Sequence, residues 1–151
     1  RRNTDVSVQV GPPALDEELL SLYRRYVQAR HDPFDPVDPE QFERFLVSSP
    51  VDSRMMRYSV GDRLVGVGWI DLLLNGVSSV YFAFDPEESS RSLGTFSIMQ
   101  EIALARELDK QWLYLGFFVP GSPKMEYKGA FGPSHYAVNG EWTTDREQIP
   151  C

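Results

Sequence analysis

The sequence predicts an α+β domain in which a mixed, mostly antiparallel sheet is flanked by helices. Three strand-like segments joined by tight turns occupy residues 54–84, and a helix over 92–108 is followed by another strand-like segment at 112–119. Hairpin strands pair antiparallel, whereas a strand–helix–strand unit returns the chain to a parallel neighbour. The length of 151 residues suits one domain, and we predict a single domain over residues 1–151.

The N-terminal third is expected to add one strand and two helices. Residues 5–11 alternate valine with polar residues, which is typical of a half-buried strand. A helix is predicted from Asp16, a good N-cap, to about His31, because apolar residues follow at helical spacing. Three prolines predict a loop over 32–39, and a second helix is expected over 39–48.

The three strands predicted next cover 54–60, 64–74 and 77–84, with turns at Gly61-Asp62 and Asn75-Gly76. Asn-Gly is a strong signal for a two-residue hairpin turn. The helix that follows carries apolar residues on more than one face, so we expect it to be central and buried. After the last strand only short elements are expected, around 124–128 and 136–138.

Composition restricts the classes of function. The net charge is −7, from 15 basic and 22 acidic residues, so contact with a polyanion requires a local basic patch. The only cysteine is Cys151, so no intramolecular disulfide or cysteine-based metal site is expected, and a cytoplasmic location is the simplest expectation. No apolar run approaches the ~20 residues that span a bilayer, and no signal-peptide core follows the first residues, which argues against membrane and secreted proteins.

Several separate motifs, which agree in order and spacing, carry a resemblance to a known family. In chain order they are Ile70-Asp71-Leu72, 76–81, Phe84-Asp85-Pro86, Ser92-Leu93-Gly94, 114–118, 124–129, Phe131 and Pro133. Together they resemble the C-terminal catalytic region of the aminoacyl-tRNA–protein transferases. This family comprises arginyltransferases and the bacterial leucyltransferases that act on N-terminal Asp or Glu.

The resemblance implies a GNAT-like fold, whose order of helices and strands agrees with the one predicted above. It implies transfer of Arg or Leu from tRNA to the N-terminal Asp or Glu of a protein, a reaction that marks the protein for degradation. Aminoacyl-tRNA is then the co-substrate, proteins with N-terminal Asp or Glu are the partners, and no further cofactor or metal is expected. Compared with this family, we expect the N-terminal cysteine-cluster domain to be absent, and Ser122-Pro123 stands where family members often have Cys.

Two other functions stay open at this stage. The first is an acyl-CoA-dependent N-acetyltransferase, because Arg91 and Gly94 match part of the phosphate-binding motif of such enzymes. Phe96 argues against it, since it occupies the last position of that motif, which is normally small. The second is a protein that only binds acidic N-termini or tRNA.

Asp71 is the first candidate for a catalytic role. It interrupts the apolar run Trp69-Ile70-Asp71-Leu72-Leu73, where a carboxylate costs free energy unless it is paired or used in chemistry. The predicted turn places Asp71 opposite Val80, on the face that holds Trp69 and Phe82. Burial there would raise the pKa of the carboxyl and suit it to accept a proton from the attacking amine. The structural alternative is a carboxylate that bonds a turn or pairs with an arginine.

The start of the helix near residue 92 is a candidate anion site. Backbone N–H groups at a helix start bind anions, and Gly94 allows close approach. We expect Arg91, Ser92 and Gly94 to meet the terminal phosphate of a tRNA acceptor end, with helix capping by Ser92 as the structural alternative. The resemblance adds Asp85 to the substrate-binding residues.

Lys124, Tyr127 and Lys128 form a cation–aromatic cluster in the loop-rich end of the chain. Lysine–phosphate contacts and base stacking on tyrosine suit a single-stranded acceptor end. Alternatively, one lysine could receive the acidic side chain of the acceptor protein, or the segment could be a solvated loop. The resemblance places Tyr127 among the catalytic candidates, together with Tyr114, whose apolar strand also explains it as core.

His31 and Tyr81 complete the set of candidates for substrate binding. His31 follows Arg30 at the end of the first helix, where a charge interaction with the helix C-terminus is the structural alternative. Arg24, Arg25 and Arg30 could add phosphate contacts along this helix, although surface arginines commonly do no more than solvate a helix face.

Overall fold

The computed structural model describes residues 2–30, 39–46, 48–122 and 125–149. The chain divides into two compact units, Arg1–Tyr114 and Leu115–Cys151. The single domain over 1–151 stays a prediction. None of the helices in the described part of the chain is long and apolar enough to cross a membrane.

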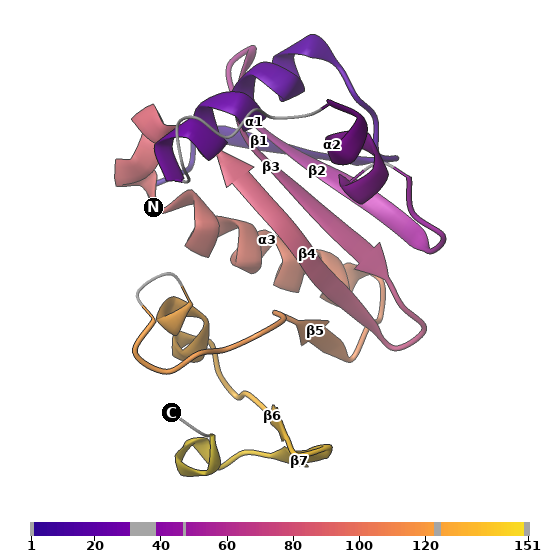
Figure 1. Cartoon of the computed structure of the whole chain (residues 1–151), viewed down its shortest axis with the longest axis vertical. Helices are drawn as coiled ribbons and strands as arrows, with labels where there is room; N and C mark the ends of the chain where they lie inside the picture. The colour runs from indigo at the N-terminus through magenta and orange to yellow at the C-terminus, as the bar shows by residue number, and fades with distance from the viewer. Residues whose placement is uncertain (1, 31–38, 47, 123–124, 150–151) are drawn as a thin grey trace. The chain divides into compact units, whose positions relative to one another are not determined.

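The first unit contains a five-stranded sheet with the strands in sequence order (Figure 1). Neighbouring strands pair antiparallel except β4 and β5, which are parallel. The prediction of a mixed, mostly antiparallel sheet with one strand–helix–strand crossover is therefore confirmed. The strands are β1 (Val6–Gly11), β2 (Asp52–Val60), β3 (Arg63–Leu72), β4 (Gly76–Phe84) and β5 (Trp112–Tyr114).

Helices cover both faces of this sheet. Figure 1 shows α1 (Glu17–Arg30) and α2 (Pro39–Leu46) on one face and α3 (Leu93–Glu107) on the other. Asp16 caps α1 as predicted, because its Oδ1 accepts a hydrogen bond of 2.8 Å from the backbone N–H of Leu19. The predicted loop over 32–39 lies almost wholly outside the described residues.

Each face has its own apolar core. On the α1/α2 face, Leu19 and Leu22 of α1 and Phe42 and Leu46 of α2 pack with residues of β2, β3 and β4. On the α3 face, Leu93 and Ala105 pack with a second set of sheet residues. The prediction that α3 is central and buried is wrong for its outer side, where Met99 is 52% exposed, while the side that faces the sheet is buried.

The turn between β3 and β4 differs from the prediction by one residue. Leu73 donates its backbone N–H to the carbonyl of Gly76 at 2.8 Å, so the two turn residues are Leu74 and Asn75. Gly76 is instead the first residue of β4 and pairs with Trp112 of β5. As a result Asp71 lies opposite Ser78, and its predicted pairing with Val80 is wrong.

An irregularity in β4 changes which aromatic side chains share a face. Trp69 pairs with Tyr81, while Ile70 pairs with Ser79, so Val80 is an extra residue in β4. Tyr81 therefore lies on the α1/α2 face beside Trp69. Phe82 packs on the opposite face, against Tyr58, so its predicted place beside Trp69 is wrong.

The last predicted strand, 112–119, is too long, because β5 ends at Tyr114. The next residues leave the sheet, with Gly116 at φ +73°, and the carbonyls of Leu115 and Phe117 accept hydrogen bonds from the Lys128 side chain. The second unit contains η2 (Glu126–Ala130), β6 (Tyr136–Val138), β7 (Glu141–Thr143) and η3 (Arg146–Gln148), which confirms short elements at two predicted places.

Candidate functional site

Asp71 lies near the turn end of β3, half-buried, on the face that α1 and α2 cover. The hydroxyl of Ser53, its partner on β2, donates a hydrogen bond to Asp71 Oδ1. Asp71 forms no ion pair with an arginine in the described part of the chain. Its Oδ2 accepts no hydrogen bond from a described residue, so this oxygen is available to another group.

An aromatic cluster adjoins Asp71 on the same face. The Tyr81 ring lies 6.2 Å from that of Trp69, 6.0 Å from Tyr23 and 6.3 Å from Tyr26. Burial raises the pKa of the Tyr81 phenol well above its ordinary value, so this group stays protonated at neutral pH. The structure therefore brings two predicted residues, Tyr81 and Asp71, onto one face, with Trp69 two residues before Asp71 on β3.

The second half of β4 has a free edge. Only Gly76, Val77 and Ser78 pair with β5. Beyond Ser78, no described strand pairs with the outer edge of β4, which leads to Asp85, η1 (Pro86–Arg91) and the start of α3. Backbone donors and acceptors along such an edge are available to an extended ligand.

Asp85 lies at the end of this edge, and its carboxylate is bound by partners within the protein. It is 3% exposed, and its Oδ2 lies 3.1 Å from the guanidinium groups of both Arg25 and Arg63. Its Oδ1 accepts a hydrogen bond from the backbone N–H of Glu87, which caps η1. Arg25, considered above as a surface cation for phosphate, thus pairs with a buried carboxylate, although its own side chain is 45% exposed.

Arg91 is likewise engaged within the protein. Its guanidinium donates two hydrogen bonds to the carboxylate of Asp5, at 2.8 and 2.9 Å, and a third to Glu88. These bonds raise the pKa of Arg91 and lower the pKa values of the Asp5 and Glu88 carboxyls. Arg91 therefore fastens the start of β1 to η1, and its donors are directed at carboxylates.

Ser92 and Gly94 lie at the start of α3. Ser92 has a positive φ of 54° and makes no side-chain hydrogen bond that caps the helix, so the capping alternative is wrong. Its hydroxyl instead accepts a hydrogen bond of 3.1 Å from Arg2. A β-carbon at Gly94 would meet no atom within 4 Å, so space is open beside this backbone.

Asp71 and the start of α3 lie at opposite ends of the β3–β4 ladder. Phe84 pairs with Gly66, five residues before Asp71 on β3. At about 3.3 Å per residue this separation is about 17 Å. One small group cannot contact both ends, whereas an extended ligand along the sheet can.

The remaining candidates fall at or after the end of the first unit, or outside the described residues. Tyr114 is the last residue of β5, and its ring packs on Gly76. In the second unit Tyr127 is 40% exposed, and Lys128 Nζ donates to the carbonyls of Leu115 at 2.7 Å and Phe117 at 3.1 Å. His31 and Lys124 lie outside the described residues.

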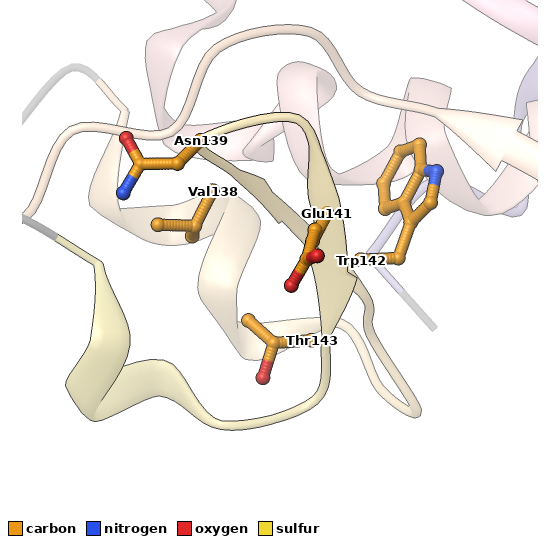
Figure 2. A pocket seen from close by; sticks show the side chains of 5 residues that line it. All are labelled: Val138, Asn139, Glu141, Trp142 and Thr143. Atoms are coloured by element: carbon orange, nitrogen blue, oxygen red, sulfur yellow. The ribbon is translucent and has the colours of Figure 1, made fainter.

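A hollow in the second unit contains none of the predicted residues. It has a volume of about 470 Å³ and is lined by Val138, Asn139, Glu141, Trp142 and Thr143 of the β6–β7 hairpin. Figure 2 shows Glu141 and Thr143 on one side of β7 and Trp142 pointing to the other. Its polar lining residues, Asn139, Glu141 and Thr143, come from one hairpin, and none of them lies in a motif that carries the family resemblance.

Sequence reasoning missed Ser53, Arg63 and the pairing of Arg25 with Asp85. The signal for Ser53 was its position on the strand that pairs with β3, but register is needed to place it opposite Asp71. Among the described residues no cluster of three His, Cys, Asp or Glu side chains is arranged to hold a metal ion.

Comparison with known proteins decides the family. A family model described as "Arginine-tRNA-protein transferase, C terminus" matches residues 18–138. The chain belongs to this family. The resemblance stated from the motifs is thereby confirmed, and the matched range includes α1 except its first residue, the whole sheet after β1, and β6.

Bacterial members of the arginine-tRNA–protein transferase family are close relatives of the chain. It is 42% identical over 146 residues to the aspartate/glutamate leucyltransferase of Pseudomonas savastanoi pv. phaseolicola, covering 95% of this chain and 62% of that protein. It is 39% identical over 145 residues to the enzyme of the same name from Acinetobacter baylyi, covering 94% and 54%. The chain thus spans somewhat more than half the length of these curated relatives.

Solved structures confirm the GNAT-like fold of this family member. An aminoglycoside acetyltransferase from an uncultured soil sample superposes with a TM-score of 0.64 at 10% identity, over 95% of this chain and 99% of that one. A GNAT family acetyltransferase from Elizabethkingia anophelis gives 0.60 at 10% identity, over 92% of each. At such low identity the likeness establishes the fold alone.

Proposed function

We propose that the protein transfers leucine from its tRNA ester to the N-terminal Asp or Glu of an acceptor protein. The match to the family model over residues 18–138 carries this proposal. The sequence motifs left Arg and Leu open, and the name of the relatives, aspartate/glutamate leucyltransferase, favours leucine and acidic acceptors. We propose a cytoplasmic location, where charged tRNA is available, and no cofactor beyond aminoacyl-tRNA.

The chemistry needs an acceptor for one proton. The α-amine attacks the ester carbonyl carbon, a C–N bond forms, the C–O bond to the ribose breaks, and the ribose oxygen leaves as a hydroxyl. An α-amine has an ordinary pKa of about 7.7–8.0, so a modest fraction is already neutral at pH 7. Asp71 Oδ2 takes the proton that the amine loses and returns it to the ribose oxygen, so the balance closes without ATP.

The tRNA end would extend along the free edge of β4. We propose that the open backbone at Gly94, at the start of α3, receives a phosphate beyond the Phe84 end of β4, which lies about 17 Å from Asp71 along the sheet. Ser92 lies beside it, and Arg91 and Asp85 act by holding this end of the sheet together. Tyr81 lines the acyl end, while His31, Tyr114, Lys124, Tyr127 and Lys128 remain candidates for contacts to substrate.

Mass spectrometry of peptides tests this function. Peptides that start with Asp, Glu or Ala are incubated with the protein and either leucyl-tRNA or arginyl-tRNA. We expect leucine to be added to the Asp and Glu peptides and not to the Ala peptide. Addition of arginine alone would correct the donor, and binding of charged tRNA and acidic peptide without product would show a binding protein instead.

An acetyltransferase is the second candidate, because the solved structures of similar fold include acetyl-CoA-dependent enzymes. The same peptides with acetyl-CoA in place of tRNA give the control. Acetylated product would replace the proposed reaction, and we expect none because Phe96 occupies the small position of the CoA motif.

A further inference from the structure

Three side chains form a polar row across the three central strands on the α1/α2 face, close to the turn between β3 and β4. Asp71 of β3 pairs with Ser53 of β2 on one side and with Ser78 of β4 on the other. All three are half-buried. Side chains directly opposite each other in a sheet lie about 4.5–5.5 Å apart at their β-carbons, so both hydroxyls flank the carboxylate.

The two serines differ in what they do. Ser53 donates a hydrogen bond to Asp71 Oδ1, whereas no hydrogen bond joins Ser78 to Asp71. An aspartate is poorly suited to a strand, and a half-buried carboxylate needs a donor that satisfies it. Ser53 supplies that donor from the start of β2, where it pairs directly with Asp71 of β3, two residues before the ladder with β1 begins at Met55.

We infer that Ser53 is a positioning residue for the transfer reaction, holding Asp71 so that Oδ2 faces the attacking amine. This inference rests on the function proposed above. The bond to Oδ1 fixes the rotation of the carboxylate, and a fixed orientation lowers the barrier by removing motions that the reaction would otherwise have to restrict. Ser53 does not touch the substrate, and Asp71 alone exchanges the proton.

If Ser53 only supported the sheet, its removal would lower the melting temperature, and activity would fall only as the protein unfolds. The test therefore measures kcat and KM separately. Ser53→Ala, Ser53→Thr and Ser78→Ala are compared with the wild-type chain in steady-state transfer of leucine to an Asp-starting peptide. A hydrogen bond to a charged group contributes about 1.5–3 kcal/mol, so Ser53→Ala is expected to lower kcat about ten- to a hundredfold at unchanged KM values. Ser53→Thr keeps the hydroxyl and should restore most of kcat.

Ser78→Ala is the matched control, because it removes a hydroxyl from the other neighbour of Asp71 without removing a hydrogen bond to it. Retention of kcat by Ser78→Ala, with loss in Ser53→Ala and rescue in Ser53→Thr, supports the inference. Wild-type kcat in Ser53→Ala overturns it while leaving the proposed function intact. Equal losses in both alanine variants, tracking their melting temperatures, also overturn it in favour of sheet support. Absence of product from the wild-type chain overturns the proposed function and the inference together.

Discussion

The ring of Tyr114 packs directly on the backbone of Gly76 where β4 and β5 run side by side. A β-carbon at Gly76 would lie 2.8 Å from Tyr114 Cε2 and 2.9 Å from the carbonyl oxygen of Trp112. Gly76 is thus needed for the close approach of two strands, and the turn before it is formed by Leu74 and Asn75. The strand–helix–strand crossover is completed at this contact.

Gly76→Ala is accordingly expected to lower the free energy of unfolding by about 1–3 kcal/mol, since the added methyl group overlaps atoms of β5. Denaturant unfolding of both proteins measures this difference in the free energy of unfolding. Gly94→Ala is the matched control, because nothing lies within 4 Å of its β-carbon position and the residue is helical. Alanine is a better helix former than glycine, so this variant should gain about 0.5–1 kcal/mol. Equal stability of Gly76→Ala and wild type would contradict the assigned contact.

Arg91→Gln is expected to lower the melting temperature at neutral pH and to make the melting temperature depend less on pH in the acid range. Arg91 holds the pKa values of the Asp5 and Glu88 carboxyls below their ordinary values of 3.8 and 4.5. A lowered folded-state pKa gives stability that is present above the ordinary pKa and is lost as the pH falls through the lowered one. Melting temperatures between about pH 7 and pH 3 should therefore fall less in Arg91→Gln than in wild type.

The control for this series is Arg24→Gln, which removes an exposed arginine from α1. It should retain the wild-type dependence on pH. If Arg91→Gln and Arg24→Gln gave the same curve as wild type, the ion pairs of Arg91 would contribute nothing measurable.

Asp85→Asn removes a buried negative charge that two arginines share. We expect a loss of about 1–3 kcal/mol in the free energy of unfolding, because the guanidinium groups of Arg25 and Arg63 then face a neutral amide. Glu87→Gln changes a neighbouring but exposed carboxylate and should leave stability within about 0.5 kcal/mol of wild type. A stable Asp85→Asn variant that had lost transfer activity would instead favour direct substrate contact.

Lys128→Met tests whether this lysine holds the loop after β5. Its ammonium group donates to the carbonyls of Leu115 and Phe117, so its loss should accelerate amide hydrogen exchange over residues 115–120. Lys110→Met removes a single hydrogen bond to the carbonyl of Leu74 and serves as the control. If hydrogen exchange in Lys128→Met matched wild type, Lys128 would not hold this loop, and only its predicted contact with phosphate would remain.

The fold was largely predictable because its signals are local. Alternating valines located β1, Asp16 located the start of α1, and the Asn75-Gly76 pair located the hairpin between β3 and β4 to within one residue. The register was not predictable, since the extra residue at Val80 depends on packing across the sheet. That single residue decides whether Tyr81 or Phe82 shares the face of Asp71.

The candidate site was predictable only where one residue stands out from its surroundings. Asp71 does so, as a carboxylate within an apolar strand. The acceptors that engage Arg91 and Lys128 could not be foreseen, because Asp5 is 86 residues from Arg91 and Leu115 offers only its backbone carbonyl. Charged side chains matched by motif can therefore have structural partners that no local pattern indicates.

The most direct test of the central claim is single-turnover transfer of radiolabelled leucine from tRNA to an Asp-starting peptide, comparing wild type with Asp71→Asn. Asn keeps the size and the bond to Ser53 but cannot take the proton. The account predicts labelled peptide with wild type and a rate at least about a hundredfold lower with Asp71→Asn at equal tRNA binding. A wild-type rate in Asp71→Asn, or no labelled peptide from either protein, would contradict it.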